Sequence, residues 1–316
     1  MAQLSFQPFN PPRIFNTLRT QGNGYIYGAY GTGQRAAITR TKDGINWTDT
    51  GGYTPSEYAG LSRVQGNILY STDGRYEYTL LVSEDLGVSW YRQPFPIENR
   101  DYSWFLLTSS NCVFVWYTQK NTLHVSKNKG ASWQNTGLTS ILEVIPTQRG
   151  TYVLARDRRT VYFSADGISW QRLPSPPISG DLYFGINSTE PAFFLPNQRS
   201  TVLWLNEVSE WVPLALPEPM NSKGAGYGLG LYALDPGLFL MSSYGSKDDP
   251  NNPMFCYFQD SGQVGEVCIT DYFAGGPIAA INNGVLFMDR FMTVISKVVR
   301  APFWQNLVLT NELVGQ

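Results

Sequence analysis

The sequence is poor in the residues that build metal sites and catalytic triads: it has one histidine, His124, and three cysteines among 316 residues. A Ser-His-Asp triad therefore has a single base available, in an apolar segment predicted to be a strand. Metal sites made from several His and Cys ligands are excluded because the sequence contains too few of these residues. Residues 248–252 carry calcium-type oxygen ligands, but their composition favours a solvated loop. We therefore expect no metal and no cofactor.

Charge and long apolar runs are also scarce. Charged residues make up 15% of the chain and the formal net charge is −2, which gives no general attraction to nucleic acid or to an anionic membrane. No stretch approaches the roughly 20 apolar residues of a membrane span, and residues 1–8 lack the basic start and apolar run of a signal peptide. We expect synthesis in the cytoplasm, no nucleic-acid partner and no membrane insertion.

The cysteines are odd in number and lie in apolar, strand-like segments, at Cys112, Cys256 and Cys268. This placement favours free buried thiols. Cys256 and Cys268 fall on consecutive predicted strands, so a bond between them across a hairpin is the alternative, and the sequence leaves their redox state open.

Aromatic residues, in contrast, make up 14% of the chain, which suits a β-rich protein with an extensive packed interior. Four tryptophans follow a short polar segment with glycine three residues before the indole, at residues 41–47, 83–90, 126–133 and 164–170. We call these segments the tryptophan turns. An Asp or Asn side chain can hydrogen-bond the backbone ahead of it, and Gly can adopt a positive φ, so each is predicted to join two strands. Trp is predicted to begin the second strand, with its ring buried against a neighbouring sheet and its N–H on a partner.

The tryptophan turns resemble the Asp-box, or bacterial neuraminidase repeat, whose pattern is Ser-x-Asp-x-Gly-x-Thr-Trp. Residues 83–90 match with Ser89 in the Thr place, residues 126–133 match with Asn128 in place of Asp, and the turns at Asp43 and Asp166 have one residue fewer between Asp and Gly. The motif occurs in sialidases, other glycosidases, sorting receptors, photosystem assembly factors and phage virion proteins. The resemblance therefore implies a β-propeller but no single activity. The residues that it assigns to the turns are Asp43, Trp47, Ser83, Asp85, Trp90, Ser126, Asn128, Trp133, Ser164, Asp166 and Trp170.

Groups of four short predicted strands repeat along the chain at about 40–50 residues, the period of a propeller blade. Around Trp90, strands are predicted at 59–64, 67–71, 78–83 and 88–92, which form an antiparallel meander. Beyond Trp170 the turn pattern decays but the strand pattern continues. One such sheet cannot bury both of its faces alone, so the units must stack radially.

The sequence thus predicts an all-β fold in which residues 1–316 form one seven-bladed β-propeller of four-stranded antiparallel blades, with six blades as the alternative. Trp304 is placed in the last strand. Residues 1–12 and 307–316 lie outside the blades, and either segment is a candidate for the strand that closes the ring. The predicted blades span approximately 13–50, 57–93, 102–136, 140–173, 182–214, 229–270 and 277–309.

The tryptophan turns are predicted to lie between the third and fourth strands of their blades, far apart from one another on a single face, where we expect a structural role. The opposite face carries the second–third turns and the connections between blades, and loops on a rigid scaffold are where binding residues gather. Arginines there are suited to hold a carboxylate or sulfate by paired hydrogen bonds, although solvated turn residues are the simpler interpretation. The candidate ligand-binding residues are Arg75, Arg158, Arg159, Arg199, Arg290, Arg100, Asp101 and Tyr272.

Sialidase activity needs three arginines around a carboxylate, a Tyr nucleophile assisted by Glu, and an Asp acid/base. Arg13-Ile14-Phe15 resembles the early Arg-Ile-Pro segment of that family but lacks its Pro, and no Tyr–Glu–Asp set is located by motif. Glycoside hydrolysis by two carboxylates stays open, since Glu98, Asp101, Asp181 and Asp271 are candidates, but no spacing selects a pair.

We therefore expect a non-enzymatic binding or assembly propeller. The predicted setting is a phage virion, where the chain would be a tail-tip, fibre-associated or receptor-binding protein that recognises a virion protein, another assembly component or a cell-surface glycan. A cytoplasmic location is the alternative. The alternative functions are a sialidase-like or other glycan-active hydrolase and an assembly-factor scaffold.

Overall fold

The fold was analysed in a computed structural model, which describes part of the chain. The described residues are 5–9, 15–20, 25–31, 35–42, 46–55, 61–72, 79–96, 104–109, 111–147, 149–177, 180, 182–184, 192–194, 201–205, 209–215, 230–235, 238–242, 255–259, 267–269, 277–281, 284–288 and 295–299. They divide into two compact units: unit 1 holds residues 1–11, 157–159 and 174–316, and unit 2 holds residues 12–156 and 160–173. Within the described ranges, no helix is long and apolar enough to cross a membrane.

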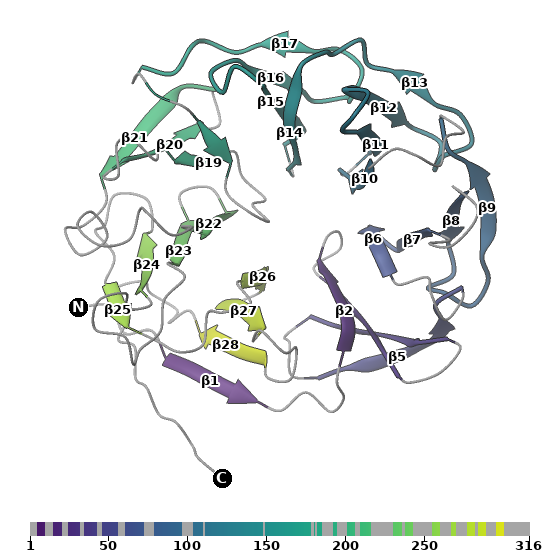
Figure 1. Ribbon diagram of the computed structural model, residues 1–316. Helices are drawn as coiled ribbons and strands as arrows, with labels where there is room; N and C mark the ends of the chain where they lie inside the picture. Colours follow the sequence, from purple (N-terminus) through teal and green to yellow (C-terminus); the bar gives the residue numbers. More distant parts are fainter. Residues whose placement is uncertain are drawn as a thin grey trace. The chain divides into compact units, whose positions relative to one another are not determined.

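Unit 2 consists of four-stranded antiparallel sheets whose strands pair in chain order (Figure 1). The first sheet contains β2 (Phe15–Thr20), β3 (Ile26–Tyr30), β4 (Ala37–Thr41) and β5 (Thr48–Tyr53). The second contains β6 (Leu61–Gln65), β7 (Ile68–Thr72), β8 (Thr79–Ser83) and β9 (Tyr91–Pro94). The third contains β10 (Trp104–Thr108), β11 (Val113–Tyr117), β12 (Thr122–Ser126) and β13 (Gln134–Asn135). The fourth contains β14 (Ile141–Pro146), β15 (Thr151–Ala155), β16 (Val161–Ser164) and β17 (Gln171–Arg172).

Unit 1 is built from sheets of the same kind. One contains β18 (Tyr183–Phe184), β19 (Ala192–Phe194), β20 (Thr201–Leu205) and β21 (Trp211–Ala215), and the next β22 (Gly230–Asp235), β23 (Leu238–Ser242), β24 (Phe255–Gln259) and β25 (Val267–Ile269). The last sheet has the order β1-β28-β27-β26, from β1 (Ser5–Phe9), β28 (Ile295–Val299), β27 (Gly284–Met288) and β26 (Pro277–Ile281). The prediction of an all-β chain of four-stranded antiparallel sheets is confirmed.

The last sheet joins the two ends of the chain. β1 pairs antiparallel with β28, with Ser5 opposite Val299 and Phe9 opposite Ile295. Of the two terminal segments that the sequence leaves open, the N-terminal one therefore adds a fourth strand. The strand expected around Trp304 lies outside the described residues.

The tryptophans of the turns sit one residue earlier than predicted. The fourth strand of each sheet begins one residue after its tryptophan rather than at it, as seen for Trp47, Trp90, Trp133 and Trp170. Each indole therefore belongs to the end of the turn, and the strand that follows it varies in length, from six residues in β5 to two in β13 and β17.

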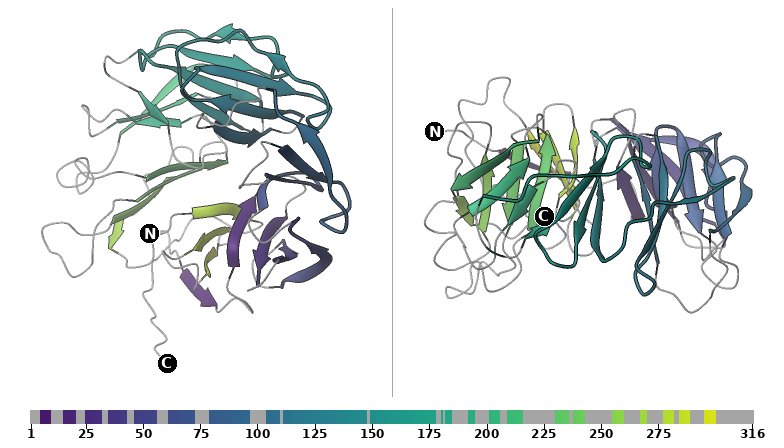
Figure 2. Two further views of the ribbon diagram at one scale, coloured as in Figure 1. Left: turned by 45° about the vertical axis from the view of Figure 1, so that its right-hand side comes forward. Right: turned by 90° about the horizontal axis from the view of Figure 1, so that it is seen from above.

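Hydrophobic side chains fill the spaces between successive sheets of unit 2, which follow one another in chain order in Figure 2. β11 shows how one strand serves two cores, because successive side chains of a strand point to opposite faces. Val113, Val115 and Tyr117 pack with residues of β7, β8 and β10, whereas Phe114 packs with residues of β12, β14 and β15. Burying each such side chain contributes roughly 1.5–3 kcal/mol, so these layers are the main stabilising element of unit 2.

Candidate functional site

The polar groups of the turn at residues 83–90 form hydrogen bonds with one another. The Ser83 hydroxyl donates to Asp85 Oδ1 at 2.8 Å and accepts from the Gly87 N–H at 2.7 Å. The Ser89 N–H donates to Asp85 Oδ1 at 2.9 Å, and the Ser89 hydroxyl donates to Oδ2 at 2.6 Å. Hydrogen bonds from Ser89 above all, and from Ser83, lower the pKa of Asp85 to about 2. This carboxylate is engaged by its own turn.

The turns at 126–133 and 164–170 repeat that geometry with different chemistry. Asn128 Oδ1 accepts from the Ser126 hydroxyl and the Ser132 N–H, both at 2.9 Å, and its amide nitrogen donates to the Ser132 hydroxyl at 2.8 Å. An amide thus replaces the carboxylate by reversing one hydrogen bond. Asp166 Oδ1 accepts from the Ser169 and Ile168 N–H groups at 2.7 and 2.9 Å, and these bonds lower its pKa. Asp43 lies outside the described residues.

Indole N–H groups link neighbouring sheets. Trp90 Nε1 donates to the carbonyl oxygen of Tyr53 at 2.7 Å, and Trp133 Nε1 donates to that of Pro94 at 2.8 Å. Trp211, which follows a segment without the turn pattern, makes the same bond to Pro174 at 2.8 Å within unit 1. The indole hydrogen bond is therefore present even where the sequence motif is absent.

Trp170 is the exception among these indoles, because its Nε1 is buried without a hydrogen-bond partner. The acceptors Pro94 and Pro174 each stand four residues after the preceding tryptophan, and the residue at that position after Trp133 is Gly137. Gly137 has a φ of +76° and its N–H bonds Asn135 Oδ1 at 2.8 Å. The chain thus makes a left-handed turn at the position where Pro94 and Pro174 present a carbonyl acceptor.

The glycines of the turns press against the preceding sheet. Gly87, Gly130 and Gly167 have φ values of +92°, +90° and +76°. A Cβ on Gly167 would lie 2.9 Å from Cys112 Sγ, and the Cys112 thiol donates to the Asp166 carbonyl oxygen at 3.2 Å. Glycine is needed both for its conformation and for the close approach. The geometry of these turns supports a structural role in holding sheet to sheet.

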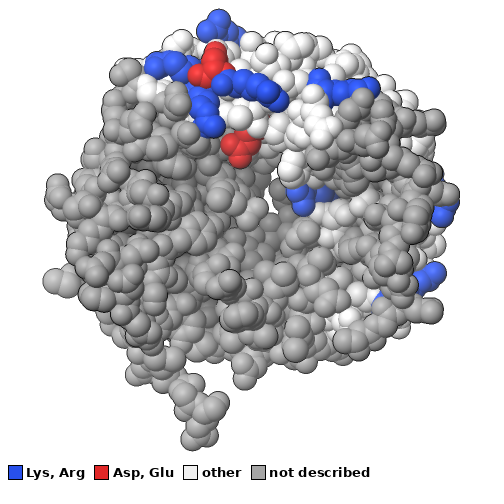
Figure 3. All heavy atoms as spheres, in the orientation of Figure 1, with Lys and Arg blue, Asp and Glu red and all other residues white. Residues whose placement is uncertain are grey.

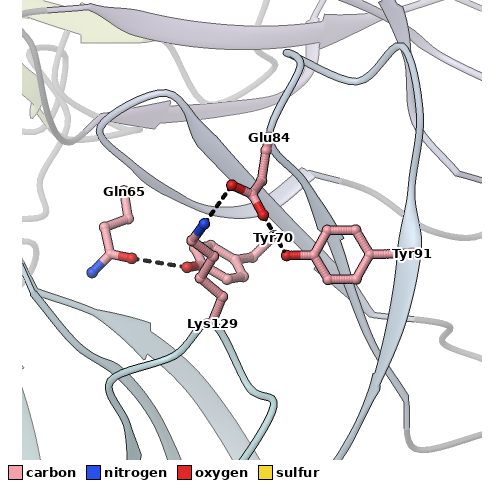
Figure 4. A network of polar contacts seen from close by, with 5 residues as sticks. All are labelled: Gln65, Tyr70, Glu84, Tyr91 and Lys129. Atoms are coloured by element: carbon pink, nitrogen blue, oxygen red, sulfur yellow. Dashed lines mark hydrogen bonds and ion pairs between the residues drawn. The ribbon is translucent and has the colours of Figure 1, made fainter.

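An exposed polar network crosses the same end of the sheets (Figure 4). Glu84 accepts a hydrogen bond from the Tyr91 hydroxyl at 2.8 Å and pairs with the Lys129 ammonium of the next turn. Both bonds, that of Lys129 first, lower the pKa of Glu84, while burial and Glu84 raise the pKa of Tyr91 to about 12. The carboxylate is held in its charged form, which suits an ion pair rather than a proton donor.

The candidate arginines lie mostly outside the described residues. Arg158 and Arg159 are described, half-exposed in the turn between β15 and β16. The Arg158 carbonyl accepts from the Leu182 N–H at 2.8 Å, and the Arg159 N–H donates to Asp157 Oδ1 at 2.9 Å, so hydrogen bonds hold their backbone. In Figure 3, basic side chains gather around an acidic one where Figure 1 draws β14 to β16. The residues not described are Arg75, Arg100, Asp101, Arg199, Tyr272 and Arg290.

An exposed aromatic ring lies at the end of the third sheet opposite its tryptophan turn. Phe105 of β10 is 50% exposed and stacks on Trp116 of β11, with ring centroids 5.5 Å apart and planes at 28°. The two residues are directly opposite in the sheet register, and Trp116 Nε1 is buried without a partner. Sequence reasoning predicted the strand but missed the exposure. The signal that could have found it is the cross-strand pairing of two aromatic residues next to the turn between β11 and β12.

Polar groups lie at the turn between β11 and β12, which follows Trp116 in the sequence. Asn121 Oδ1 and Thr122 Oγ1, at the start of β12, are buried without partners. The exposed Arg156 guanidinium reaches the same turn, with Nη2 3.5 Å from the Thr118 carbonyl oxygen. We call Phe105, Trp116, Asn121, Thr122 and Arg156 the Phe105 surface. Its exposed groups are an apolar ring and a positive charge, which suit binding, while its unpaired donor and acceptors are buried.

The single histidine of the chain lies in the third sheet, on β12. His124 is buried with Nε2 unpartnered, its ring meets Tyr117 edge-on with centroids 5.9 Å apart, and burial lowers its pKa. Across the described residues, no three His, Cys, Asp or Glu side chains are placed to hold a metal ion.

The fold is similar to that of solved β-propellers. YCF48 bound to a D1 peptide matches with a TM-score of 0.58 at 14% identity, covering 94% of this chain and 96% of that one. A catalytically inactive virginiamycin B lyase from Staphylococcus aureus with quinupristin matches with a TM-score of 0.59 at 10% identity, covering 94% and 99%. YCF48 from Cyanidioschyzon merolae gives 0.51 at 14% identity, covering 93% and 98%. No protein-family model and no curated protein matches the sequence. At these identities the likeness shows the fold alone.

Proposed function

We propose that the chain is a non-enzymatic binding or assembly propeller that recognises a protein partner at the ends of its sheets opposite the tryptophan turns. The observation that carries this proposal is the Phe105 surface, where a half-exposed ring and an exposed arginine lie at the end of the third sheet. Aromatic and arginine side chains are enriched in protein interfaces and carry much of their binding energy. The similarity to a propeller with a bound D1 peptide supports a peptide as the kind of ligand.

The architecture that we propose for this function is one ring of seven blades. The support is the run of four-stranded sheets in chain order, with β1 completing the last of them. We further propose that the tryptophan turns are Asp-boxes, since in three turns the hydroxyl of the first Ser and the N–H of the Ser before Trp both donate to Oδ1 of the Asp or Asn.

The setting that we propose is a phage virion, as a tail-tip, fibre-associated or receptor-binding protein. This assignment rests on the resemblance of the tryptophan turns to a family that includes virion proteins. A binding role is preferred to glycoside hydrolysis because Asp85 and Asp166 are engaged within their turns. The candidate carboxylates Glu98, Asp101, Asp181 and Asp271 lie outside the described residues.

The test selects ligands from a displayed library of random peptides and compares matched surface variants. Phe105→Ser removes the exposed ring, and Val88→Ser removes a side chain that is 66% exposed in a tryptophan turn. We expect selected peptides to bind the wild-type chain and Val88→Ser equally and to bind Phe105→Ser at least about tenfold more weakly, the loss typical of an interface hot spot.

Three outcomes would overturn the proposal. One is equal binding of the selected peptides to Phe105→Ser. Another is failure of the library to yield peptides while a glycan array binds. The third is turnover of fluorogenic sialosides or of a polysaccharide panel, which would establish the hydrolase instead.

A further inference from the structure

Two of the three cysteines are register partners in one strand pair of unit 1. β24 and β25 are antiparallel, and the register places Cys256 directly opposite Cys268, between the pairs Phe255 with Ile269 and Tyr257 with Val267. Residues directly opposite in an antiparallel pair share a face of the sheet, with Cα atoms about 4.5 or 5.5 Å apart. Both separations fall within the roughly 4.4–6.8 Å that a disulfide spans.

A disulfide between these two cysteines would attach the last strand of its sheet to the neighbouring strand. β25 is the last strand in the order β22-β23-β24-β25 and has three residues, Val267–Ile269. Its described strand partner is β24. A covalent link from the middle residue of β25 would fix the register of this strand independently of its hydrogen bonds, and it would close a short loop in the unfolded chain.

We propose that Cys256 and Cys268 form a reversible cross-strand disulfide that staples β25 to β24. The oxidant is a small-molecule disulfide such as oxidised glutathione. One cysteine thiolate attacks it, forming a mixed disulfide and releasing one glutathione thiolate; the second cysteine thiolate then attacks the mixed disulfide and releases the other. The two protein thiols lose two electrons and two protons, and the oxidant is reduced to two thiols. Glutathione keeps cytoplasmic thiols reduced, so the staple closes where the protein meets an oxidising environment.

Cys112 provides an internal comparison within the same chain. It is 1% exposed, its thiol donates to the Asp166 carbonyl oxygen, and burial raises its pKa. A buried, protonated thiol reacts slowly with a disulfide. The three cysteines are therefore expected to separate into one inert thiol and one reactive pair.

The experiment incubates the full chain with oxidised or reduced glutathione, unfolds it in an alkylating reagent and measures the intact mass. We expect three alkylated cysteines after reduction and one after oxidation, with peptide mapping identifying a Cys256–Cys268 link. Dithiothreitol should restore three. The wild-type measurement needs no substitution, so it stands even where a variant fails to fold.

Matched variants assign the bond. Cys112→Ser should keep the link, while Cys256→Ser and Cys268→Ser should each lose it and leave Cys112 alkylated. The proposal is wrong if the oxidised wild-type chain alkylates at all three cysteines, if the link involves Cys112, or if glutathione remains attached to Cys256 and Cys268 without a bond between them.

Discussion

The indole N–H of Trp133 donates to the carbonyl oxygen of Pro94 on the preceding sheet at 2.8 Å, whereas the buried indole N–H of Trp170 has no acceptor. The two tryptophans occupy equivalent places in successive turns, so they form a natural comparison. Trp133 contributes both a hydrogen bond between sheets and side-chain packing, whereas Trp170 contributes packing alone.

Replacing each tryptophan by phenylalanine separates the two contributions. Both substitutions remove a similar volume, but Trp133→Phe also breaks the hydrogen bond to the Pro94 carbonyl, while Trp170→Phe removes an unpaired buried donor. We expect Trp133→Phe to lower the free energy of unfolding by about 1–2 kcal/mol more than Trp170→Phe does. Urea unfolding followed by tryptophan fluorescence measures the difference. Equal losses would show that the hydrogen bond adds nothing.

Two adjacent glycines of β5 test the contact between the first and second sheets. The Tyr53 N–H donates to the Gly87 carbonyl oxygen at 3.0 Å, and a Cβ on Gly52 would lie 2.2 Å from the Leu86 carbonyl oxygen. We expect Gly52→Ala to destabilise the protein by about 3 kcal/mol or more, because backbone must move.

Gly51→Ala is the control for that substitution. Gly51 has a φ of +77° with nothing within 4 Å of an added Cβ, so only the cost of the left-handed conformation remains, about 1 kcal/mol. Thermal unfolding of both variants measures the difference. A cost for Gly51→Ala that equals or exceeds the cost for Gly52→Ala would contradict the packing argument.

Asp85 makes stability depend on acid pH. Its pKa of about 2 in the folded state lies below the ordinary value of 3.8, so its contribution is present above about pH 4 and is lost as the pH falls towards 2. Because Asn128 fills the equivalent place in the next turn, Asp85→Asn should fold at pH 7 and lose less stability than wild type between pH 4 and 2. Urea midpoints across that range measure this. An unchanged pH slope would count against the assignment.

His124 makes the stability of the protein depend on pH in a higher range than Asp85 does. Burial lowers its pKa below the ordinary 6.5, so the folded state holds it neutral while the unfolded chain gains a proton as the pH drops below about 6.5. Stability should fall from pH 7.5 to pH 5. His124→Phe should reduce that fall, because it removes the titrating group. The same pH dependence in the variant would show that other groups cause it.

The sequence predicted the repeating strands and the tryptophan turns because both are local: alternation of apolar residues and an Asp or Asn before Gly act within about ten residues. It did not predict the acceptors of Trp90 and Trp133, which lie 37 and 39 residues away. It also missed the exposure of Phe105, since a residue on a predicted strand is covered only if a side chain from another sheet reaches it. The sequence also did not predict which terminal segment pairs with β28, because this contact joins residues that are far apart in the chain.

Hydrogen–deuterium exchange with and without a peptide selected by display tests the proposed binding role most directly, because it locates the contact in the unaltered chain. We expect slower exchange in residues 104–109 and 116–122 on peptide binding, with residues 83–90 and 126–133 unchanged. Protection confined to the tryptophan turns, with β10 and β11 unaffected, would contradict it.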